Sequence, residues 1–560
     1  MHQSFSYPRF EYRQPPELQA PGAAPRRYPL VIVGAGPVGM TAALDARRQG
    51  IDVLVLDDDN TVSVGSRGLC YAKRTLEILD RCGVGQAVVD KGVTWNVGRT
   101  FFGEDEVFSF NLLPQPEHQR PGMVNLQQYY LEAFQVEACA RDGVEIRWKN
   151  KVVSVTPGAH GVELQVDTPD GRYTLQADWL IACDGARSPV RHMLGLDMDG
   201  RVFQDRFLIA DVVMKAPFPD ERWFWFDPPF HPNQSVLLHR EADDVWRIDF
   251  QLGWDADPEA ARQPEHVVPL IRAMLGEQHP FELEWVSVYT FQCRRMERFN
   301  HGRVLFAGDA AHQVSPFGAR GANSGIQDSD NLLWKLKLVM DGRAPARLLD
   351  SYSDERCLAA DENILNSTRS TDFITPKSAM SRTFRNAVLS LARQHPFARK
   401  LVNSGRLSVP THYSHSGLNT PASDAFEGTM APGAPMDDAP VEAQGQPGWL
   451  LHHLGNRFQV LVYAEGPEAL NGPLLDSLQV LSQGLVPVQA VVVSPVALTP
   501  PTDGPAMSCL VDSKGLVAQR CDLRPGSALL IRPDQHVAAR WRSLDTAAVQ
   551  SALARATANT

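Results

Sequence analysis

The stretch "PLVIVGAGPVGMTAALDARRQGIDVLVLDDD", residues 29–59, sets the fold of the first part of this chain. An apolar strand runs into a glycine turn, an amphipathic helical pattern follows, and a second apolar strand ends in acids. Gly34, Gly36 and Gly39 form a G-x-G-x-x-G pattern directly after the first strand. Because strands and helices keep alternating from about Leu30 onward, we expect an α/β protein with a doubly wound, Rossmann-like parallel sheet.

The glycine pattern predicts a dinucleotide site. The first glycine permits a tight turn, the second lets the backbone approach a pyrophosphate, and the third seats the helix against the sheet. Pro37 begins that helix, whose free N–H groups would face the phosphates. Asp57, at the end of the second strand, suits a ribose hydroxyl. The alternative is a tight turn in an unrelated α/β protein, and these residues alone leave FAD and NAD(P) equally open.

Two further strands also end in an acid. "WLIACDGARSPVRHMLG", residues 179–195, ends its strand in Asp184-Gly185, and Arg191 opens the helix that follows. "RVLFAGDAAHQVSPFGARGANSGIQDSDNLLWKL", residues 303–336, ends its strand in Gly308-Asp309, followed by a loop of small residues. Since ligands of doubly wound folds bind at the carboxyl edge of the sheet, we expect all three acid-tipped turns to meet there around one long nucleotide, FAD.

Asp309 is the acid that most requires a partner. If its carboxylate were left unpaired at a crowded strand end, the folded state would be destabilised by several kcal/mol, the order of magnitude for burying an unpaired polar group. A ribityl hydroxyl would remove this cost. The next helix would begin at Gly321, Ala322 and Asn323, and its dipole would favour the negative charge of reduced flavin. A purely structural glycine loop is the alternative.

With these three motifs in this order, residues 30–410 resemble the single-component FAD-dependent aromatic hydroxylases, which include 4-hydroxybenzoate, phenol and 3-(3-hydroxyphenyl)propionate hydroxylases. The resemblance implies that the glycine pattern binds the ADP half, that Asp-Gly contributes to FAD and NAD(P)H binding, and that Gly-Asp holds the ribityl chain. It also implies that Arg67 in "SRGLCYAKRTLEIL" and Gln128 in "LQQYYLE" reach the FAD. Pro316 in "SPFG" resembles the proline beside the flavin.

The reaction implied by the resemblance is hydroxylation of a phenolic ring with NAD(P)H and O2, through a flavin hydroperoxide. A base or proton relay near the ring is then expected, because a phenol is activated by losing its proton. NAD(P)H would dock transiently, since no second G-x-G-x-x-G follows a strand. Baeyer–Villiger or epoxidising chemistry on a polyketide-like aromatic uses the same motifs and stays open, as does a binding flavoprotein without catalysis. Neither the ring nor the choice between NADH and NADPH follows from the sequence.

The substrate domain is expected in the aromatic-rich, alternating segment from Asp205 to Leu252, which predicts a mostly antiparallel sheet. Its catalytic candidates are His239 and Arg247, together with His312 and Pro316 in the loop after Asp309. His312 would either fix that loop or lie near the flavin, and Arg247 would bind a substrate carboxylate or form a cross-strand ion pair. Other candidates for the pocket or its wall, with core packing as the alternative, are Trp223, Phe224, Trp225, Phe226 and Trp246.

The pattern along the chain predicts several domains. These are an extended arm (1–28), three FAD-binding parts (29–92, 121–203, 293–345), two substrate-domain parts (93–120, 204–292), a helical region (346–410), a Pro- and Gly-rich linker (411–448) and a C-terminal domain (449–560). "GSALLIRPDQHVAARW" resembles the end of the phenol and phenylpropionate hydroxylase branch, which implies a thioredoxin-like C-terminal domain. Because it holds no C-x-x-C, we expect a structural role, with dimer contacts.

Composition excludes several classes of protein. The net charge of -11 and the lack of a Lys/Arg block argue against a nucleic-acid surface. No apolar run reaches the roughly 18 residues of a membrane span, and the N-terminus lacks the core of a signal peptide. Eight scattered cysteines without metal-ligand spacing predict no metal and a reduced, cytoplasmic protein. We therefore expect a cytoplasmic homodimer acting on a small aromatic molecule.

Overall fold

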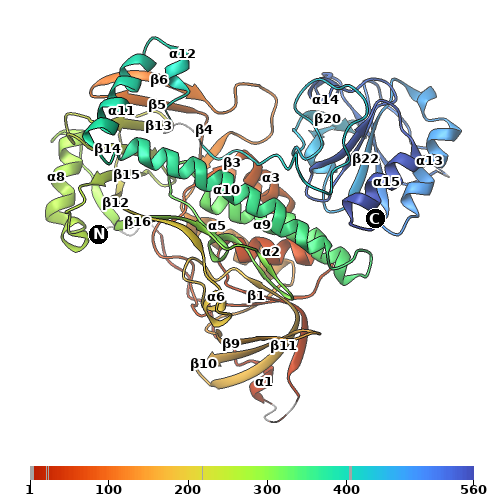
Figure 1. The fold of residues 1–560 in the computed structure, drawn as a ribbon, viewed down its shortest axis with the longest axis horizontal. Helices are drawn as coiled ribbons and strands as arrows, with labels where there is room; N and C mark the ends of the chain where they lie inside the picture. Colours follow the sequence, from red (N-terminus) through yellow and green to blue (C-terminus); the bar gives the residue numbers. More distant parts are fainter. Residues whose placement is uncertain (1–4, 20–21, 23, 217, 403–406, 503) are drawn as a thin grey trace.

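The computed structural model describes residues 5–19, 22, 24–216, 218–402, 407–502 and 504–560, and these residues form four β-sheets (Figure 1). The N-terminal arm lies along the first of them and leads into a short helix, α1 (Pro16–Gln19). Aromatic rings anchor it: Phe5 stacks on Tyr129 and Phe10 on Trp148, each pair with ring centroids 4.4 Å apart.

The first sheet contains the glycine pattern and has the strand order β17-β18-β11-β1-β2-β8, with β10 and β9 added beside β11. Every pairing from β18 to β8 is parallel. Its strands are β1 (Arg26–Val33), β2 (Val53–Leu56), β8 (Glu145–Arg147), β9 (Lys151–Pro157), β10 (Val162–Thr168), β11 (Gly171–Ala182), β17 (Asn300–His301) and β18 (Val304–Phe306). The helices packed around it include α2 (Pro37–Arg48), α5 (Gln128–Arg141), α6 (Pro189–Met193) and α9 (Gly321–Met340). The predicted parallel α/β core is confirmed.

The second sheet has the order β19-β16-β12-β15-β14-β13-β5-β6 and is antiparallel except between β13 and β5. Its strands are β5 (Val97–Phe102), β6 (Asp105–Asn111), β12 (Asp199–Val213), β13 (Arg222–Phe226), β14 (Ser235–Arg240), β15 (Val245–Leu252), β16 (Glu282–Arg295) and β19 (His312–Gln313). The short helices α7 (Pro258–Ala261) and α8 (Pro264–Leu275) follow β15. Residues 97–111 form the hairpin β5–β6, held by antiparallel cross-strand pairing.

A small third sheet has the strand order β3-β7-β4. Its strands are β3 (Cys70–Ala72), β4 (Val93–Trp95) and β7 (Met123–Asn125), and the helices α3 (Lys73–Arg81) and α4 (Gly85–Lys91) connect the first two. The long helix α10 (Leu348–Ile374) packs beside α9 and runs from the C-terminal domain, where its first residue is buried, to the second sheet, where its last residues are buried (Figure 1). α11 (Ala379–Ala392) and α12 (Pro396–Arg399) then pack near β6.

The C-terminal sheet has the order β21-β20-β24-β23-β22-β25-β26. Its strands are β20 (Pro440–Ala443), β21 (Gln446–Trp449), β22 (Phe458–Tyr463), β23 (Val488–Ser494), β24 (Met507–Val511), β25 (Ala528–Ile531) and β26 (Val537–Trp541), with helices α13 (Gly472–Ser482), α14 (Leu516–Cys521) and α15 (Thr546–Ala556). The segment expected to be a linker, 411–448, already contributes β20 and the buried side chains of Met430 and Met436 to this domain. Its Pro- and Gly-rich composition hid these core contacts.

Candidate active site

The carboxyl ends of parallel strands meet at one edge of the first sheet. The turn after β11 is bonded to the end of β1, because Cys183 donates its N–H to the Val33 carbonyl at 2.8 Å. The turn after β18 is bonded to the end of β11 in the same way, from Ala307 N–H to the Ala182 carbonyl at 3.1 Å. The end of β1 is bonded in turn to the end of β2, from Gly34 N–H to the Leu56 carbonyl at 2.8 Å, so the three acid-tipped turns lie side by side along one rim.

The glycine turn is closely packed at two positions and open at the third. A Cβ at Gly34 (φ +105°) would lie 2.4 Å from the Cys183 carbonyl oxygen, and one at Gly39 would lie 2.0 Å from the Gly34 oxygen. At Gly36, by contrast, no other heavy atom lies within 4 Å of the Cβ position. Pro37 begins α2 immediately after this open position. The packing matches the roles of the three glycines in a pyrophosphate-binding turn.

Asp57 is half-buried beside this turn. Its carboxylate accepts the N–H of Ala35 at 2.6 Å and the N–H of Asp59 at 2.8 Å. Burial raises the pKa of Asp57 to about 6, although these two bonds lower it. Each carboxylate oxygen has a second lone pair, so Asp57 can still accept a ribose hydroxyl.

The Asp-Gly turn is tied to the Gly-Asp turn by an arginine. Arg191 donates from its guanidinium to the Ala310 carbonyl at 2.8 Å. Asp184 accepts the Val190 N–H on one oxygen at 2.9 Å, while its buried Oδ1 has no hydrogen-bond partner among the described residues. Gly185 (φ +78°) has open space at its Cβ position. Arg191 thus positions the loops, and Asp184 retains an acceptor for a ligand.

Asp309 lies exposed at the rim, and no side-chain hydrogen bond is recorded for it among the described residues. The surrounding protein nevertheless desolvates its carboxyl group and raises its pKa. Gly308 (φ +62°) donates its N–H to Asp328 at 2.9 Å, which fixes the turn. The Cβ position of Gly321, at the start of α9, meets no atom closer than 3.9 Å. The predicted site for a ribityl chain is therefore open.

The side chains of four other predicted cofactor residues differ in what they contact. Asn323 accepts the Ala72 N–H at 2.8 Å and donates to the carbonyls of Cys70 and Ala319, so its amide holds β3 against α9. Ala322, next to it, is half-buried and has no polar side chain to offer.

Gln128 likewise contacts the protein, while Arg67 is free to reach outward. Gln128 accepts the Gly68 N–H at 2.8 Å and donates to Glu132 at 2.7 Å. Arg67 belongs to the same loop and is exposed. Gln128 therefore positions the loop that presents Arg67. Together, the open Gly36, the available oxygens of Asp57 and Asp309, and the unpartnered Asp184 oxygen fit an FAD.

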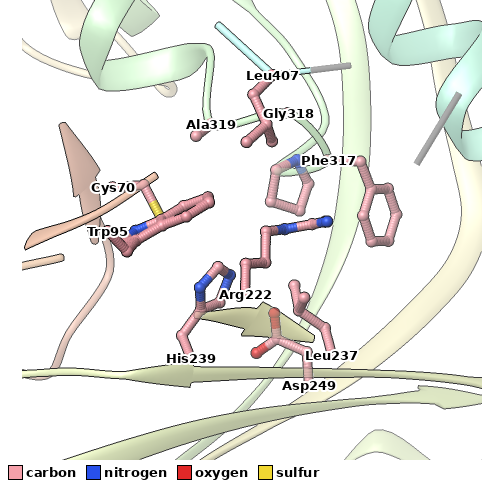
Figure 2. Close-up of a pocket in the computed structure, with 11 residues that line it drawn as sticks. Cys70, Trp95, Arg222, Leu237, His239, Asp249, Phe317, Gly318, Ala319 and Leu407 are labelled. Atoms are coloured by element: carbon pink, nitrogen blue, oxygen red, sulfur yellow. The ribbon is translucent and has the colours of Figure 1, made fainter. Parts of the chain in front are cut away.

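A second centre, a small cavity of about 40 Å³, lies between the second sheet and the loop after Asp309 (Figure 2). Its lining residues are Cys70, Trp95, Arg222, Leu237, His239, Asp249, Pro316, Phe317, Gly318, Ala319 and Leu407. Ligand sites generally measure about 300–1,000 Å³. The cavity is therefore smaller than a typical ligand site.

The polar residues of the cavity share one face of the second sheet. Leu237 lies opposite Asp249, and His239 lies opposite Arg247, in the antiparallel pair β14–β15. Because side chains alternate along a strand, Arg222 shares this face, while the intervening residues point to the other. That other face, which includes Trp225 and Trp246, packs on α8. Phe224 and Phe226 belong to a different core, which they form with α11. Trp223 also packs outside the cavity. The aromatic candidates are thus core residues.

Arg222 and Asp249 are buried at the cavity without a hydrogen bond or ion pair among the described residues, while the Arg222 guanidinium lies 5.3 Å from the centroid of the Phe224 ring. The Arg222 side chain is 2% exposed, and neither a hydrogen bond nor an ion pair of its guanidinium is found among the described residues. Asp249 Oδ1 is buried and unpartnered in the same sense. Burial lowers the pKa of Arg222 to about 10 and raises the pKa of Asp249 to about 7. Figure 2 shows both side chains beside His239.

His239 lines the cavity, as predicted, with its Nδ1 3.4 Å from the Asn125 amide nitrogen. Burial and the positive charges of Arg222 and Arg247 hold the pKa of His239 well below its usual range. A neutral imidazole of low basicity is a poor proton acceptor. The geometry therefore favours His239 as a hydrogen-bonding group in the wall.

Arg247 does not line the cavity. Its guanidinium pairs with Asp211 at 2.9 and 3.1 Å, contacts the Ser66 carbonyl, and lies 3.4 Å from Glu241. This is the ion-pair alternative of the sequence analysis. The Arg247 guanidinium is therefore engaged within the protein and is not placed to bind a substrate.

His312 fixes the loop between the two centres. Its Nε2 bonds to Asp328 at 2.7 Å, and Asp328 also pairs with Arg356 at 2.6 Å. The ring stacks on Phe299. Pro316, four residues later, lines the cavity. Of the four predicted catalytic residues, the cavity thus brings together His239 and Pro316.

Sequence reasoning missed Arg222 and Asp249. The available signal was the presence of charged residues on the otherwise apolar strands "RWFWF" and "VWRIDFQL", each in a position that alternation assigns to one face. Cys70 and Trp95 gave no such signal, because the chain brings them to the cavity from the small third sheet.

Other expectations concern absent features. Within the described ranges, no group of three or more His, Cys, Asp or Glu side chains is arranged to hold a metal ion. Among the helices described, none is long and apolar enough to cross a membrane. The cysteines are free thiols.

Comparison with known proteins identifies relatives along most of the chain. Residues 27–367 match the family described as "FAD binding domain". The 3-(3-hydroxy-phenyl)propionate/3-hydroxycinnamic acid hydroxylase of Mycolicibacterium smegmatis is 28% identical over 545 residues, covering 93% of this chain and 91% of that protein. The 6-methylpretetramide 4-monooxygenase of Streptomyces rimosus is 29% identical over 557 residues, covering 96% and 94%.

Solved structures share the fold. The flavin-dependent monooxygenase PieE, solved with FAD and substrate, aligns with a TM-score of 0.80 at 24% identity over 96% of this chain and 100% of its own. Aklavinone-11 hydroxylase, solved with FAD and aklavinone, aligns with a TM-score of 0.76 at 23% identity over the same shares.

Proposed function

The chain belongs to the FAD binding domain family, and from this premise we propose that it is an FAD-dependent monooxygenase that hydroxylates a phenolic ring with NAD(P)H and O2. One observation carries the proposal: a single loop joins the two centres. Asp309 lies at the open rim, and Pro316, only seven positions later, lines the cavity. A flavin held at the rim and a ring held in the cavity would meet across this loop.

Each residue then has a role in holding the reactants. Bound FAD would supply the oxygen-activating chemistry after reduction by NAD(P)H. The glycine turn would take the pyrophosphate, Asp57 the adenosine ribose, and Asp309 the ribityl chain. Asp184 and Arg67 would complete the contacts. The small cavity would exclude water from the reacting ring.

A polyketide-like aromatic is the second candidate substrate, and Baeyer–Villiger or epoxidising chemistry the second candidate reaction. The similarity to an enzyme named for 6-methylpretetramide, over 96% of this chain, favours the polyketide-like substrate. We further propose a cytoplasmic homodimer in which the C-terminal domain is thioredoxin-like and structural, consistent with its lack of paired cysteines.

The test is purification followed by a substrate screen. FAD should copurify, and NADH or NADPH oxidation should accelerate when a suitable phenol is added, with a product that gains one oxygen and keeps its ring. Asp309→Ala should weaken FAD binding by about 10- to 100-fold, the loss expected for a charge-assisted hydrogen bond, while Asp341→Ala on the far end of α9 should not. Protein without flavin, or nicotinamide oxidation that no phenol changes, would refute the proposal.

A further inference from the structure

Two unpartnered atoms of opposite kind belong to residues that line the cavity. Arg222 Nη1 is a donor without an acceptor, and Asp249 Oδ1 is an acceptor without a donor, among the residues that the structure describes. No ion pair within 4.0 Å joins these two side chains. Burying a charged group without a partner is costly, and proteins rarely retain such groups unless a ligand completes them.

A hydroxyl group matches this pair of atoms. Its O–H donates and its oxygen accepts, so one hydroxyl can bond to Asp249 and Arg222 together. A carboxylate has only acceptors, so it would satisfy Arg222 but would offer no donor to Asp249 Oδ1. An ammonium group has only donors and would do the reverse. The cavity therefore selects for a hydroxyl on the ring.

We propose, on the basis of the proposed function, that Asp249 is the catalytic base that accepts the proton of the substrate's phenolic hydroxyl, and that Arg222 pairs with the oxygen left behind. The phenolic O–H bond breaks and an O–H bond to Asp249 Oδ1 forms. The electron pair stays on the phenolic oxygen, facing the guanidinium. No oxidant or reductant takes part in this step, which prepares an electron-rich ring for oxygen transfer.

The other polar residues of the cavity are less suited to this role. His239 carries a pKa held well below its usual range by burial and two arginines. Burial raises the pKa of the Cys70 thiol to about 12. Asp249, whose pKa burial raises to about 7, is matched to accept a proton near neutral pH. Arg247 is already paired with Asp211.

The first test measures binding without turnover. Oxidised, FAD-loaded enzyme is titrated with phenol and with its methyl ether, anisole, and with 3-(3-hydroxyphenyl)propionate and its methyl ether, following the flavin absorbance. Wild-type protein should prefer at least one phenol over its ether by about 10- to 100-fold, the loss expected for charge-assisted bonds. Asp249→Asn and Arg222→Met should each reduce this preference toward unity. Lack of any preference in the wild type would overturn the proposal.

Matched controls exclude a general effect on the sheet. Arg240 pairs with Asp244 at the partly exposed turn between β14 and β15, so Arg240→Met and Asp244→Asn repeat the same substitutions outside the cavity. Both should keep the wild-type preference. Titration with 3-phenylpropionate, which has a carboxylate but no hydroxyl, distinguishes the alternative: if Arg222→Met weakens its binding as much as that of the hydroxylated acid, Arg222 binds the carboxylate and the proposal is wrong.

The second test uses turnover. With a phenol that stimulates NAD(P)H oxidation, Asp249→Asn should lower the hydroxylation rate at neutral pH by about 10²- to 10⁴-fold, the contribution of a general base. The rate should recover as rising pH ionises the phenol in solution, which a merely structural role would not produce. Wild-type rates in Asp249→Asn would overturn the proposal and leave the proposed function intact. A wild-type enzyme that binds phenols selectively but hydroxylates none would refute only the proposed function.

Discussion

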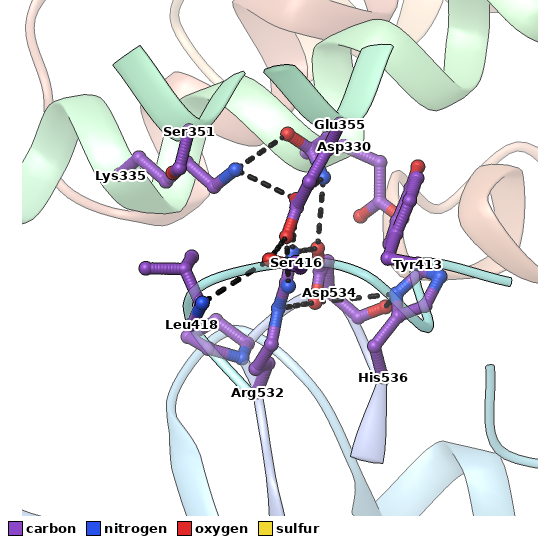
Figure 3. Close-up of polar contacts among 12 residues, drawn as sticks. Asp330, Lys335, Ser351, Glu355, Tyr413, Ser416, Leu418, Arg532, Asp534 and His536 are labelled. Atoms are coloured by element: carbon purple, nitrogen blue, oxygen red, sulfur yellow. Dashed lines mark hydrogen bonds and ion pairs between the residues drawn. The ribbon is translucent and has the colours of Figure 1, made fainter. Parts of the chain in front are cut away.

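Two clusters of buried charge in this molecule are built in opposite ways. The interface cluster, where α9 and α10 meet the C-terminal domain, centres on Glu355 (Figure 3). Glu355 accepts from Arg532 at 2.6 and 2.9 Å and from Lys335 at 2.8 Å, and Arg532 also pairs with Asp534. Burial alone would raise the pKa of Glu355, but Arg532 and Lys335 hold it far below its usual range.

The cavity cluster contains charges that are equally buried and yet incompletely paired. Arg222 and Asp249 each leave an atom unpartnered within the described residues, and both have pKa values displaced toward the neutral form. The comparison separates two uses of buried charge. Where every group is paired, the charges join parts of the chain; where groups are left unpaired, they await a ligand.

The largest effect is expected at the interface cluster. Glu355→Gln should lower the free energy of unfolding by about 3–5 kcal/mol, because it leaves Lys335 and Arg532 buried with too little negative charge. Denaturant unfolding of the FAD-loaded protein, followed by fluorescence, measures this. If the Glu355→Gln protein unfolded at the same denaturant concentration as the wild type, the proposed distinction between the two clusters would be wrong.

The next effect depends on pH and concerns Asp249. Its pKa is about 7 in the folded protein and roughly 3.9 in the unfolded chain. Ionisation of Asp249 therefore destabilises the folded state. The stability that Asp249 contributes is present below about pH 4 and is lost as pH rises through about 7. The free energy of unfolding of Asp249→Asn should therefore rise relative to that of the wild type between pH 5 and 8, by about 2–4 kcal/mol at most.

The charged and titratable groups around Asp249 are retained in this comparison, so they affect both proteins. They are Arg247, Asp211, Arg222, Glu241, Tyr289 and Cys70, with His239 in the same cavity lining. The difference between wild type and Asp249→Asn, measured by unfolding at each pH, isolates the one carboxyl group. A difference that does not change between pH 5 and 8 would show that Asp249 is paired.

A smaller gain is expected from Arg222→Met. Removing a buried, unpaired charge should leave the free energy of unfolding unchanged or raise it by about 1–3 kcal/mol, since Asp249 loses a weak attraction in return. The same unfolding assay measures it. If Arg222→Met were as destabilising as Glu355→Gln, Arg222 would be a structural residue, and the comparison would fail at its central point.

The smallest effect sets the baseline. Lys337 and Asp341 form a partly exposed pair, 2.6 Å apart, on α9. Asp341→Asn should change the free energy of unfolding by no more than about 1 kcal/mol, because water screens such pairs. A larger loss would mean that α9 is sensitive to any change of charge and that Glu355→Gln reports the helix rather than the cluster.

Much of the cofactor edge could be predicted from local sequence, and much of the substrate cavity could not. The acid after each parallel strand, Asp57, Asp184 and Asp309, was identified from patterns only a few residues long. The roles of Asn323 and Gln128 were harder to predict, because their amides bond to segments of chain that the motifs do not contain. Arg247 and Arg222 are both arginines of one sheet face; the sequence analysis named Arg247, with an ion pair as one of its two alternatives, and did not name Arg222, which lines the cavity.

The sequence by itself determined the parallel sheet, its glycine turn and the rim of acids, because turn geometry and strand periodicity act between near neighbours. Only the tertiary structure decided which buried charges have partners. Arg532 and Glu355 are separated by 177 positions, and Arg247 finds Asp211 across a strand pair. Pairing energies depend on distance in space and on exclusion of water, which no local pattern records.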